Sequence, residues 1–151
     1  MHRFDDDRPL VLGGVTIPGG RGLAGHSDAD VLCHAVADAV LGATGLGDIG
    51  EQFPPGSAEW KDASSLLLLR RVGEMGRSAG YAVTSVDSVL MLESPKIASF
   101  RDEMSRNIGA ALAITPDAVG VKATTTDGLG TVGRGEGAAC MAVALVERAG
   151  G

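Results

Sequence analysis

The sequence predicts an α+β fold in which a mixed β-sheet carries helices packed on one face. Three segments repeat apolar residues every three or four positions, as one face of a helix does. Other segments are short, rich in Val and bounded by glycine or proline, as strands are. The chain has 151 residues, the length of one domain, so we expect residues 1–151 to form a single domain around one hydrophobic core.

The N-terminal half predicts a strand followed by two helices. Residues 10–17 form a short apolar segment that a glycine pair breaks, which could make it a hairpin. Residues 27–44 follow the helical period, and Ser27 or Asp28 could cap this helix. Residues 63–78 predict a second helix, because apolar residues recur along it and Gly80, two positions after its end, suits a helix C-terminus.

The C-terminal half predicts a third helix between strands. Residues 81–92 are rich in Val and predict a strand. Ser94-Pro95 predicts the start of a helix over 95–112, because Ser caps helices and Pro is favoured at their first position. Residues 119–123 and 138–147 predict two more strands, joined by a polar, glycine-rich loop. The expected order is therefore β-α-α-β-α-β-β.

The composition excludes several classes of protein. A net charge of −6, with three Phe, one Trp and one Tyr, is unlike the basic, aromatic surface of a nucleic-acid-binding protein. The apolar run at 138–146 has nine residues, whereas a membrane span needs about 20. No signal-peptide pattern is found, and Cys33 and Cys140 lie in apolar runs. We therefore expect a cytoplasmic protein with buried free thiols that binds neither nucleic acid nor membranes.

One cluster of polar residues surrounds the start of the first helix. His26 precedes this helix, where backbone N–H groups favour anions, so it could donate to a phosphate. Asp30, His34 and Asp38 are four positions apart, and imidazole beside carboxylates is a normal environment for zinc. Alternatively, Ser27-Asp28 is only a cap and His34 is a helix histidine paired with acids. The N-terminal histidine could add a second imidazole, although no spacing links it to this cluster.

A second cluster follows the strand at 119–123. Residues 124–126 are threonines, and Asp127, several glycines and Arg134 come next. Hydroxyls, backbone N–H groups and arginine suit phosphate oxygens, and Asp127 could hold a divalent cation. The pattern of a P-loop is missing. The alternative is a long hairpin loop with an Arg–Glu ion pair, and Ser94-Pro95-Lys96 alone is best explained as a helix cap.

Three long motifs in these segments resemble one family. They are HSDADVLCHAVADAVLGATGLGDIGEQFP, the segment ESPK, and VKATTTDGLGTVGRGEG, in that order. Over residues 2–148 the chain resembles the 2-C-methyl-D-erythritol 2,4-cyclodiphosphate synthases. This resemblance implies a small α+β subunit that assembles into a homotrimer with active sites between neighbouring subunits. It also implies conversion of 4-diphosphocytidyl-2-C-methyl-D-erythritol 2-phosphate to 2-C-methyl-D-erythritol 2,4-cyclodiphosphate with release of CMP, in the non-mevalonate isoprenoid pathway.

The same resemblance implies roles for individual residues. His2 and His34 match zinc-binding histidines, and Asp127 matches a ligand of a second divalent cation, Mg²⁺ or Mn²⁺, at the diphosphate. His26 and Thr125 match residues that stabilise the transition state. The other matched residues line the substrate site, together with His2 and Asp127: Ser27, Asp48, Ile49, Gly50, Phe53, Pro54, Pro55, Gly56, Ser57, Leu92, Glu93, Ser94, Pro95, Lys96, Ile97, Ala98, Ala123, Thr124, Thr126, Thr131 and Arg134.

The sequence departs from the family pattern in two places. The family's first strand and the Asp of its Asp-x-His zinc motif would precede His2, and Met1 fills the x position, so two protein ligands to zinc are expected in the sequence as given. Pro55-Gly56-Ser57 replace acidic residues of a loop near the substrate. A non-catalytic trimer that binds a nucleotide or phosphate is therefore an alternative. Another is a metal-dependent phosphohydrolase with Asp38 or Asp48 as its base.

Overall fold

Within residues 1–150, which the computed structural model describes, the strands form one five-stranded mixed sheet in the order β2-β1-β5-β3-β4. β3 and β4 run parallel, and the other neighbouring strands are antiparallel. The strands are β1 (His2–Leu12), β2 (Val15–Leu23), β3 (Tyr81–Met91), β4 (Val119–Thr124) and β5 (Gly137–Arg148). The prediction of a mixed sheet is confirmed.

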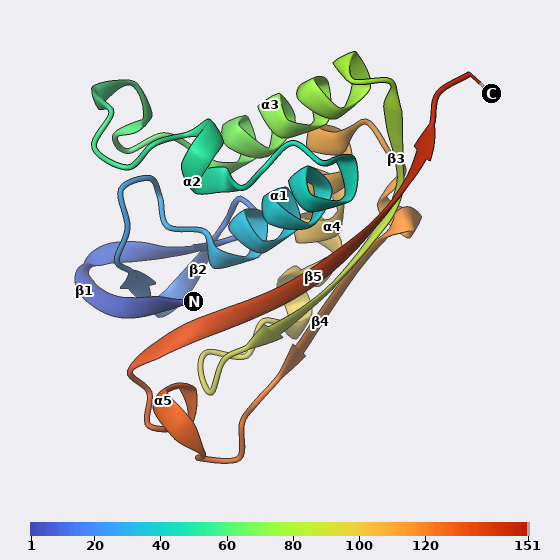
Figure 1. Cartoon of the computed structure of the whole chain (residues 1–151). Coiled ribbons are helices and arrows are strands. Elements are labelled where there is room, and N and C mark those ends of the chain that lie inside the picture. The colour runs from blue at the N-terminus through green and yellow to red at the C-terminus, as the bar shows by residue number, and fades with distance from the viewer. Residues whose placement is uncertain (151) are drawn as a thin grey trace.

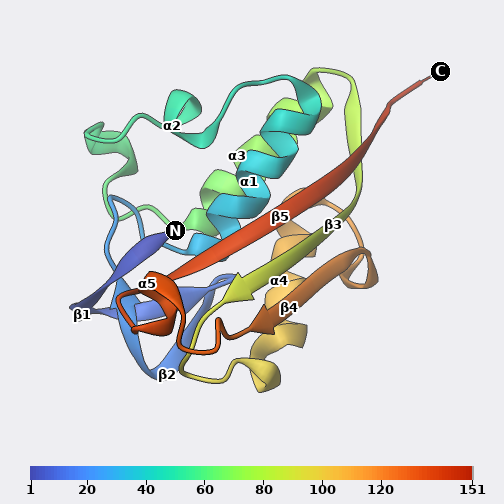
Figure 2. The same ribbon diagram turned by 60° about the horizontal axis from the view of Figure 1, so that its bottom comes forward.

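Helices cover one face of the β5-β3-β4 part of the sheet and leave the opposite face bare (Figure 1, Figure 2). The longer helices are α1 (Val31–Thr44), α3 (Ser65–Ser78) and α4 (Arg101–Leu112). Single turns form α2 (Ile49–Gln52) and α5 (Gly130–Gly133), and 3₁₀ turns cover Ala58–Trp60, Ala98–Phe100 and Pro116–Ala118. The prediction that helices pack on one face is therefore also confirmed.

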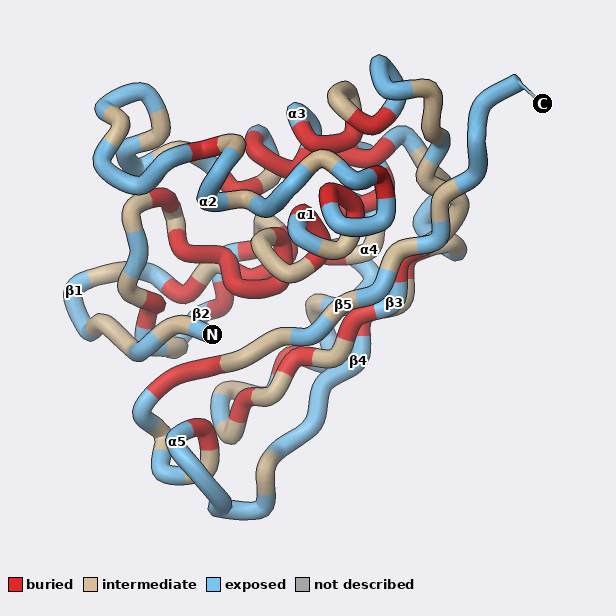
Figure 3. Tube along the Cα trace, viewed as in Figure 1, coloured by how far each residue is buried: buried red, intermediate tan, exposed pale blue. Residues whose placement is uncertain are grey.

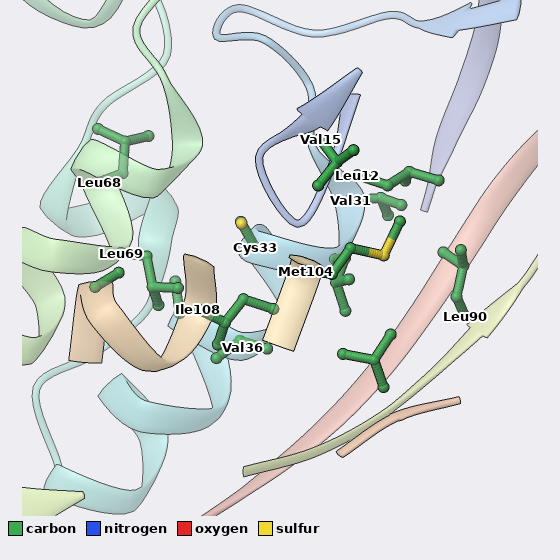
Figure 4. Close-up of a cluster of buried hydrophobic side chains, with 14 of the residues drawn as sticks. Leu12, Val15, Val31, Cys33, Val36, Leu68, Leu69, Leu90, Met104 and Ile108 are labelled. Atoms are coloured by element: carbon green, nitrogen blue, oxygen red, sulfur yellow. The ribbon is translucent and has the colours of Figure 1, made fainter. Parts of the chain in front are cut away.

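The hydrophobic core lies between the three longer helices and the sheet (Figure 3, Figure 4). Val36 of α1, Leu69 of α3 and Ile108 of α4 are fully buried there. Leu90 of β3 and Met104 of α4 are fully buried in the same cluster. The apolar stripes predicted along each helix thus meet in one core, which fixes how α1 lies against the sheet.

The helix α1 begins later than the sequence predicts, and its N-cap is Asp30 instead of Ser27 or Asp28. The fully buried Asp30 carboxylate accepts hydrogen bonds from the backbone N–H of Leu32 and Cys33 at 3.1 and 3.0 Å. It also accepts from the N–H of Gly14 at 2.7 Å, in the turn between β1 and β2. Asp30 is the cap because it satisfies donors of two elements at once.

The N-terminal strand is longer than predicted and is one arm of a true hairpin. β1 starts at His2, not Leu10, and turns into β2 through Gly13-Gly14, whose φ angles are +56° and +71°. Irregular pairing around Pro9 interrupts the alternation of buried and exposed residues. Because of this break and the polar residues around it, the first half of β1 lacks the alternating pattern by which a strand is recognised in a sequence.

The third long helix starts at Arg101, not Pro95. Ser94-Pro95 lies in a bend, so neither residue begins a helix. Leu92 and Ile97 on either side of the bend are 5% and 2% exposed. Burial of these two side chains outweighs the local preference for a helix start and shapes the segment into a loop.

The bare face of the sheet is apolar along β5. Met141, Val143 and Leu145 alternate along this strand and are 67%, 66% and 66% exposed. Three large apolar side chains in a row on one exposed face are unusual for a protein surface. Among residues 1–150, no helix has the length and apolar character needed to cross a membrane.

Candidate active site

Two imidazoles that are far apart in the sequence meet beside the start of α1. Nε2 of His2 lies 3.0 Å from Nδ1 of His34, and the ring planes are inclined by 73°. Pairing of His2 with Ala138 of β5 fixes the first residue of β1 in this position. The sheet therefore supplies the link between the two histidines that no spacing in the sequence predicted.

Both imidazoles are held in their neutral form. Burial, together with the His34 ring and the N-terminal amine, lowers the pKa of His2 to about 4. Burial also lowers the pKa of His34, and the nearby Asp28 carboxylate opposes this shift. Neutral rings present nitrogen lone pairs, which is the form that zinc binds. The chemistry of this pair therefore fits the predicted zinc-binding histidines.

The carboxylates of α1 do not join the imidazole pair. Asp30 is used as the helix cap, and Asp38 accepts a hydrogen bond from the N–H of Ile49 at 2.8 Å. Of the acids predicted near His34, Asp30 and Asp38 are thus bonded elsewhere, and Asp28 is the carboxylate close enough to affect the ring. Within residues 1–150, no three His, Cys, Asp or Glu side chains lie close enough together to hold a metal ion.

The loop that carries His26 is held from three sides. Arg8 donates hydrogen bonds to the carbonyl oxygen of Gly25, at 2.5 Å, and to that of Ser27. The carbonyl oxygen of His26 accepts from the N–H of Asp62 at 2.9 Å. These contacts fix the backbone on both sides of His26. Nε2 of its ring lies 2.9 Å from the carbonyl oxygen of Ser57.

A cavity of about 170 Å³ opens beside this loop and the imidazole pair. The predicted site residues that line it are His26, Ser27, His34, Ile49, Gly50, Phe53 and Pro55. Trp60 also lines it and packs edge-to-face on Phe53 at 5.1 Å, a contact that sequence reasoning missed because Trp60 lies in an irregular loop. His26, Ser27 and His34 of the first cluster are thus brought together with residues of the segment after α1.

The segment after α1 is positioned by two carboxylates. Asp48 caps α2 by accepting from the N–H of Glu51 at 2.9 Å, while Asp38 holds the next residue, Ile49. In the following loop, the N–H of Ser57 donates to the carbonyl oxygen of Pro54 at 3.2 Å. The positive φ of Gly56, +96°, accommodates the turn.

A second cavity, of about 270 Å³, lies where the parallel strands β3 and β4 end. Its lining contains most of the predicted 92–98 and 123–125 residues: Leu92, Glu93, Pro95, Lys96, Ile97, Ala98, Ala123, Thr124 and Thr125. Arg101 also lines it and was not predicted, because nothing in the sequence distinguishes a surface arginine of a helix from one at a cavity. The two cavities share no lining residue.

The loop after β4 is closed by its own hydrogen bonds. The Glu93 carboxylate accepts from the N–H of Thr126 at 2.7 Å and from its hydroxyl at 3.0 Å. The hydroxyl of Thr125 donates to Asp127 at 3.2 Å. Arg134 pairs with its neighbour Glu136 at 2.6 Å, as the loop interpretation predicted.

Of the predicted residues in this loop, only Thr131 lies near the imidazole pair within the described subunit. Thr125 lines the second cavity, whereas the imidazole pair borders the first. Thr131 lines a small hollow together with His2. A ligand would therefore have to meet two separate parts of this surface.

The fold defines a class of α+β protein with one cavity beside an imidazole pair and another at the ends of two parallel strands. The chain belongs to the YgbB family, whose model matches residues 1–147. It is 57% identical over 149 residues to the 2-C-methyl-D-erythritol 2,4-cyclodiphosphate synthase of Salinibacter ruber. The matched region covers 99% of this chain and 95% of that relative. It is 53% identical over 150 residues to the synthase of Pelotomaculum thermopropionicum, and the match covers 99% of this chain and 93% of that relative.

Solved structures agree with this family. The CDP-bound form of a 2-C-methyl-D-erythritol 2,4-cyclodiphosphate synthase matches with a TM-score of 0.87 and 32% identity, over 97% of this chain and 95% of that one. The CDP complex of Plasmodium falciparum IspF matches with a TM-score of 0.82 and 30% identity, over 98% of this chain and 89% of that one. The family predicted from the motifs is confirmed.

Proposed function

We propose that this chain converts 4-diphosphocytidyl-2-C-methyl-D-erythritol 2-phosphate to 2-C-methyl-D-erythritol 2,4-cyclodiphosphate and CMP. It would thus act as a phosphorus–oxygen lyase of the non-mevalonate isoprenoid pathway. Its main support is that relatives named for this activity match almost the whole chain at more than half identity. Related structures with bound CDP support a cytidine nucleotide as the ligand.

The proposed reaction is an intramolecular phosphoryl transfer. An oxygen of the 2-phosphate forms a bond to the β-phosphorus, and the bond from that phosphorus to the oxygen of CMP breaks, so CMP leaves. Such a transfer needs positioning and charge neutralisation rather than a protein nucleophile. His26 and Thr125 would stabilise the charge that builds on the phosphoryl oxygens, and Ser27 would donate to a phosphate.

The second cavity is the proposed nucleotide site. Its wall is formed by residues of the 92–98 loop and the 123–125 strand end, where backbone and hydroxyl groups would bond to a base and ribose. Lys96 and Arg101 add positive charge at its edge, which suits a diphosphate. The first cavity, beside Asp48, Ile49 and Gly50, would hold the methylerythritol hydroxyls.

Two metal ions belong to the proposal. The neutral, converging nitrogens of His2 and His34 are the donors that a zinc ion would take from this chain. The exposed Asp127 carboxylate is a suitable ligand for Mg²⁺ or Mn²⁺ at a diphosphate. When bound, these ions would withdraw charge from the phosphate oxygens and so favour the transfer.

A homotrimer is the proposed working form. The two cavities share no residue, so a complete site requires the first cavity of one subunit to face the second cavity of a neighbour. The apolar row of Met141, Val143 and Leu145 on the bare sheet face gives neighbouring subunits a surface to bury. We place the reaction in the cytoplasm, where the free thiols of Cys33 and Cys140 would stay reduced.

The rival activities gain no support. The candidate bases of a phosphohydrolase, Asp38 and Asp48, each position backbone through Oδ1, and neither lines the first cavity. A trimer that only binds nucleotide would not need the imidazole pair. Cyclisation is therefore the activity that gives a role to most of the residues around the two cavities.

Product analysis tests the proposal. The purified protein, given substrate with Zn²⁺ and Mg²⁺, should release CMP and cyclic diphosphate in equal amounts, measured by chromatography and ³¹P NMR. His26→Ala should lower the rate, whereas Ser64→Ala should not, because Ser64 makes no side-chain cap hydrogen bond on α3. Inorganic phosphate as the product, or no turnover by the wild type, would refute it.

A further inference from the structure

We infer that Ser65 and Asp28 are positioning residues that hold the His34 ring from behind and fix which of its nitrogens carries the hydrogen. The three side chains come from the start of α3, the loop before α1 and α1 itself. They form a chain of hydrogen bonds from carboxylate to hydroxyl to imidazole. The metal consequence of this inference rests on the proposed function, but the hydrogen-bond assignment does not.

The contacts are close and shielded from solvent. The Ser65 hydroxyl lies 2.9 Å from Nε2 of His34 and also contacts Oδ1 of Asp28. Oδ2 of Asp28 accepts from the backbone N–H of Ser65 at 3.0 Å, so the carboxylate grips Ser65 at two points. Ser65 is 1% exposed, so water does not compete for its hydroxyl.

Counting hydrogens settles the direction of each bond. An ionised carboxylate only accepts, so the single hydrogen of the Ser65 hydroxyl is donated to Asp28. The Ser65 oxygen must then accept from His34, so Nε2 of His34 carries a hydrogen. Nδ1 of His34 is left with its lone pair, directed at Nε2 of His2 at 3.0 Å.

Ser27 is the other hydroxyl near Nε2 of His34, at 3.1 Å. Its oxygen already accepts from the N–H of Ala29 at 3.2 Å. Because Nε2 of His34 is a donor, the hydroxyl hydrogen of Ser27 is not required there, and its acceptors are the Ser65 oxygen at 3.4 Å or a ligand in the first cavity, which Ser27 lines. The relay thus leaves the hydroxyl hydrogen of Ser27 unused by His34.

The expected effect is on metal affinity. A partner that fixes the tautomer and orientation of a ligating histidine is typically worth about ten- to a hundredfold in metal binding. Ser65→Ala leaves the Ser27 oxygen as a second acceptor for Nε2 of His34, so we expect about a tenfold loss of zinc affinity. Asp28→Asn keeps the shape but removes the charge and should weaken zinc binding in the same direction.

The tautomer can be measured in the metal-free protein by long-range ¹H–¹⁵N NMR of the histidine rings. Wild-type His34 should show a protonated Nε2 and an unprotonated Nδ1. Ser65→Ala should reduce the population of this tautomer, while Ser64→Ala, the neighbouring exposed serine, should leave it unchanged. A merely structural role of Ser65 would not change the tautomer.

Zinc affinity is measured on the same proteins by competition with a chromogenic chelator. The inference is overturned if wild-type His34 is protonated on Nδ1, a result that needs no variant to fold. It is equally overturned if Ser65→Ala retains both the tautomer and the zinc affinity. A wild type that binds no zinc would instead refute the metal part of the proposed function, and the tautomer would still decide the relay.

Discussion

The two imidazoles at the start of β1 and on α1 are residues whose protonation is coupled to folding. His2 has a pKa of about 4 in the fold, against 6.5 for the free side chain, so folding favours its neutral form. The stability from this effect is fully present above pH 6.5 and is lost as the pH falls from 6.5 toward 4. Acidification should therefore weaken the fold before most carboxylates titrate.

We predict this loss in the metal-free protein. The free energy of unfolding, from urea titrations between pH 7 and 4, should fall more for the wild type than for His2→Gln. The difference should be about 1 kcal/mol after allowance for partial solvent screening. Parallel curves for the two proteins would show that the His2 ring does not resist protonation.

A second prediction separates metal from nucleotide binding. His34→Ala should lose bound zinc and cyclisation together, because alanine has no lone pair to donate. Lys96→Ala should keep its zinc and raise KM by roughly ten- to a hundredfold, as expected for one charged hydrogen bond of roughly 1.5–3 kcal/mol. Elemental analysis and steady-state kinetics measure both, and zinc at the wild-type level in His34→Ala would contradict the ligand assignment.

Among the secondary-structure elements, α1 depends most on a single side chain. Asp30→Ala removes the cap of α1 and leaves the N–H of Gly14 without its acceptor. We expect the free energy of unfolding to fall by about 2–4 kcal/mol, from the lost cap and the unpaired buried donor. Chemical denaturation measures the change.

The matched control for this prediction is Ser64→Ala. Ser64 is the N-cap of α3 but makes no side-chain hydrogen bond there, so its removal should cost little. Equal losses for the two variants would mean that the buried carboxylate contributes no more than an ordinary surface residue.

Elements defined by local patterns could be predicted from the sequence. The helix α3 and the strands β3, β4 and β5 lie within two residues of their expected bounds, because apolar period and terminal glycines are local signals. The start of α4 was wrong because burial of Ile97 decides it. Long-range packing of this kind leaves no trace in a window of sequence.

The site divides in the same way. Sequence motifs pointed to loops that line cavities: His26 lines the first and Lys96 the second. The contact between His2 and His34 could not be read from spacing, because β5 creates it by pairing with β1. Ser65 escaped notice for a similar reason: a serine at a helix start resembles any other cap.

For the whole molecule, we predict a trimer in solution. Light scattering should give about three times the subunit mass of 15.3 kDa. Val143→Asp should reduce this mass and the cyclisation rate together, because a buried unpaired charge on the bare sheet face opposes association.

The control for the trimer prediction is Leu67→Asp. Leu67 is also a partly exposed apolar residue, 43% exposed, but it lies on α3 in the helical layer. This variant should keep the wild-type mass. A monomeric wild type that still cyclises its substrate would rule out sites shared between subunits.

The pairing of β1 with β5 has a consequence for how the protein is made. His2 and Arg3 are held by Ala138 and Gly137, and the N–H of Phe4 bonds to the carbonyl oxygen of Glu136 at 2.9 Å. Residues 2–4 therefore wait for residues 136–138 to be synthesised before they reach their native neighbours. Because contacts between distant parts of a chain form slowly, the two imidazoles come together late in folding. Zinc would accordingly be acquired only after the start of β5 has been made and has paired with β1.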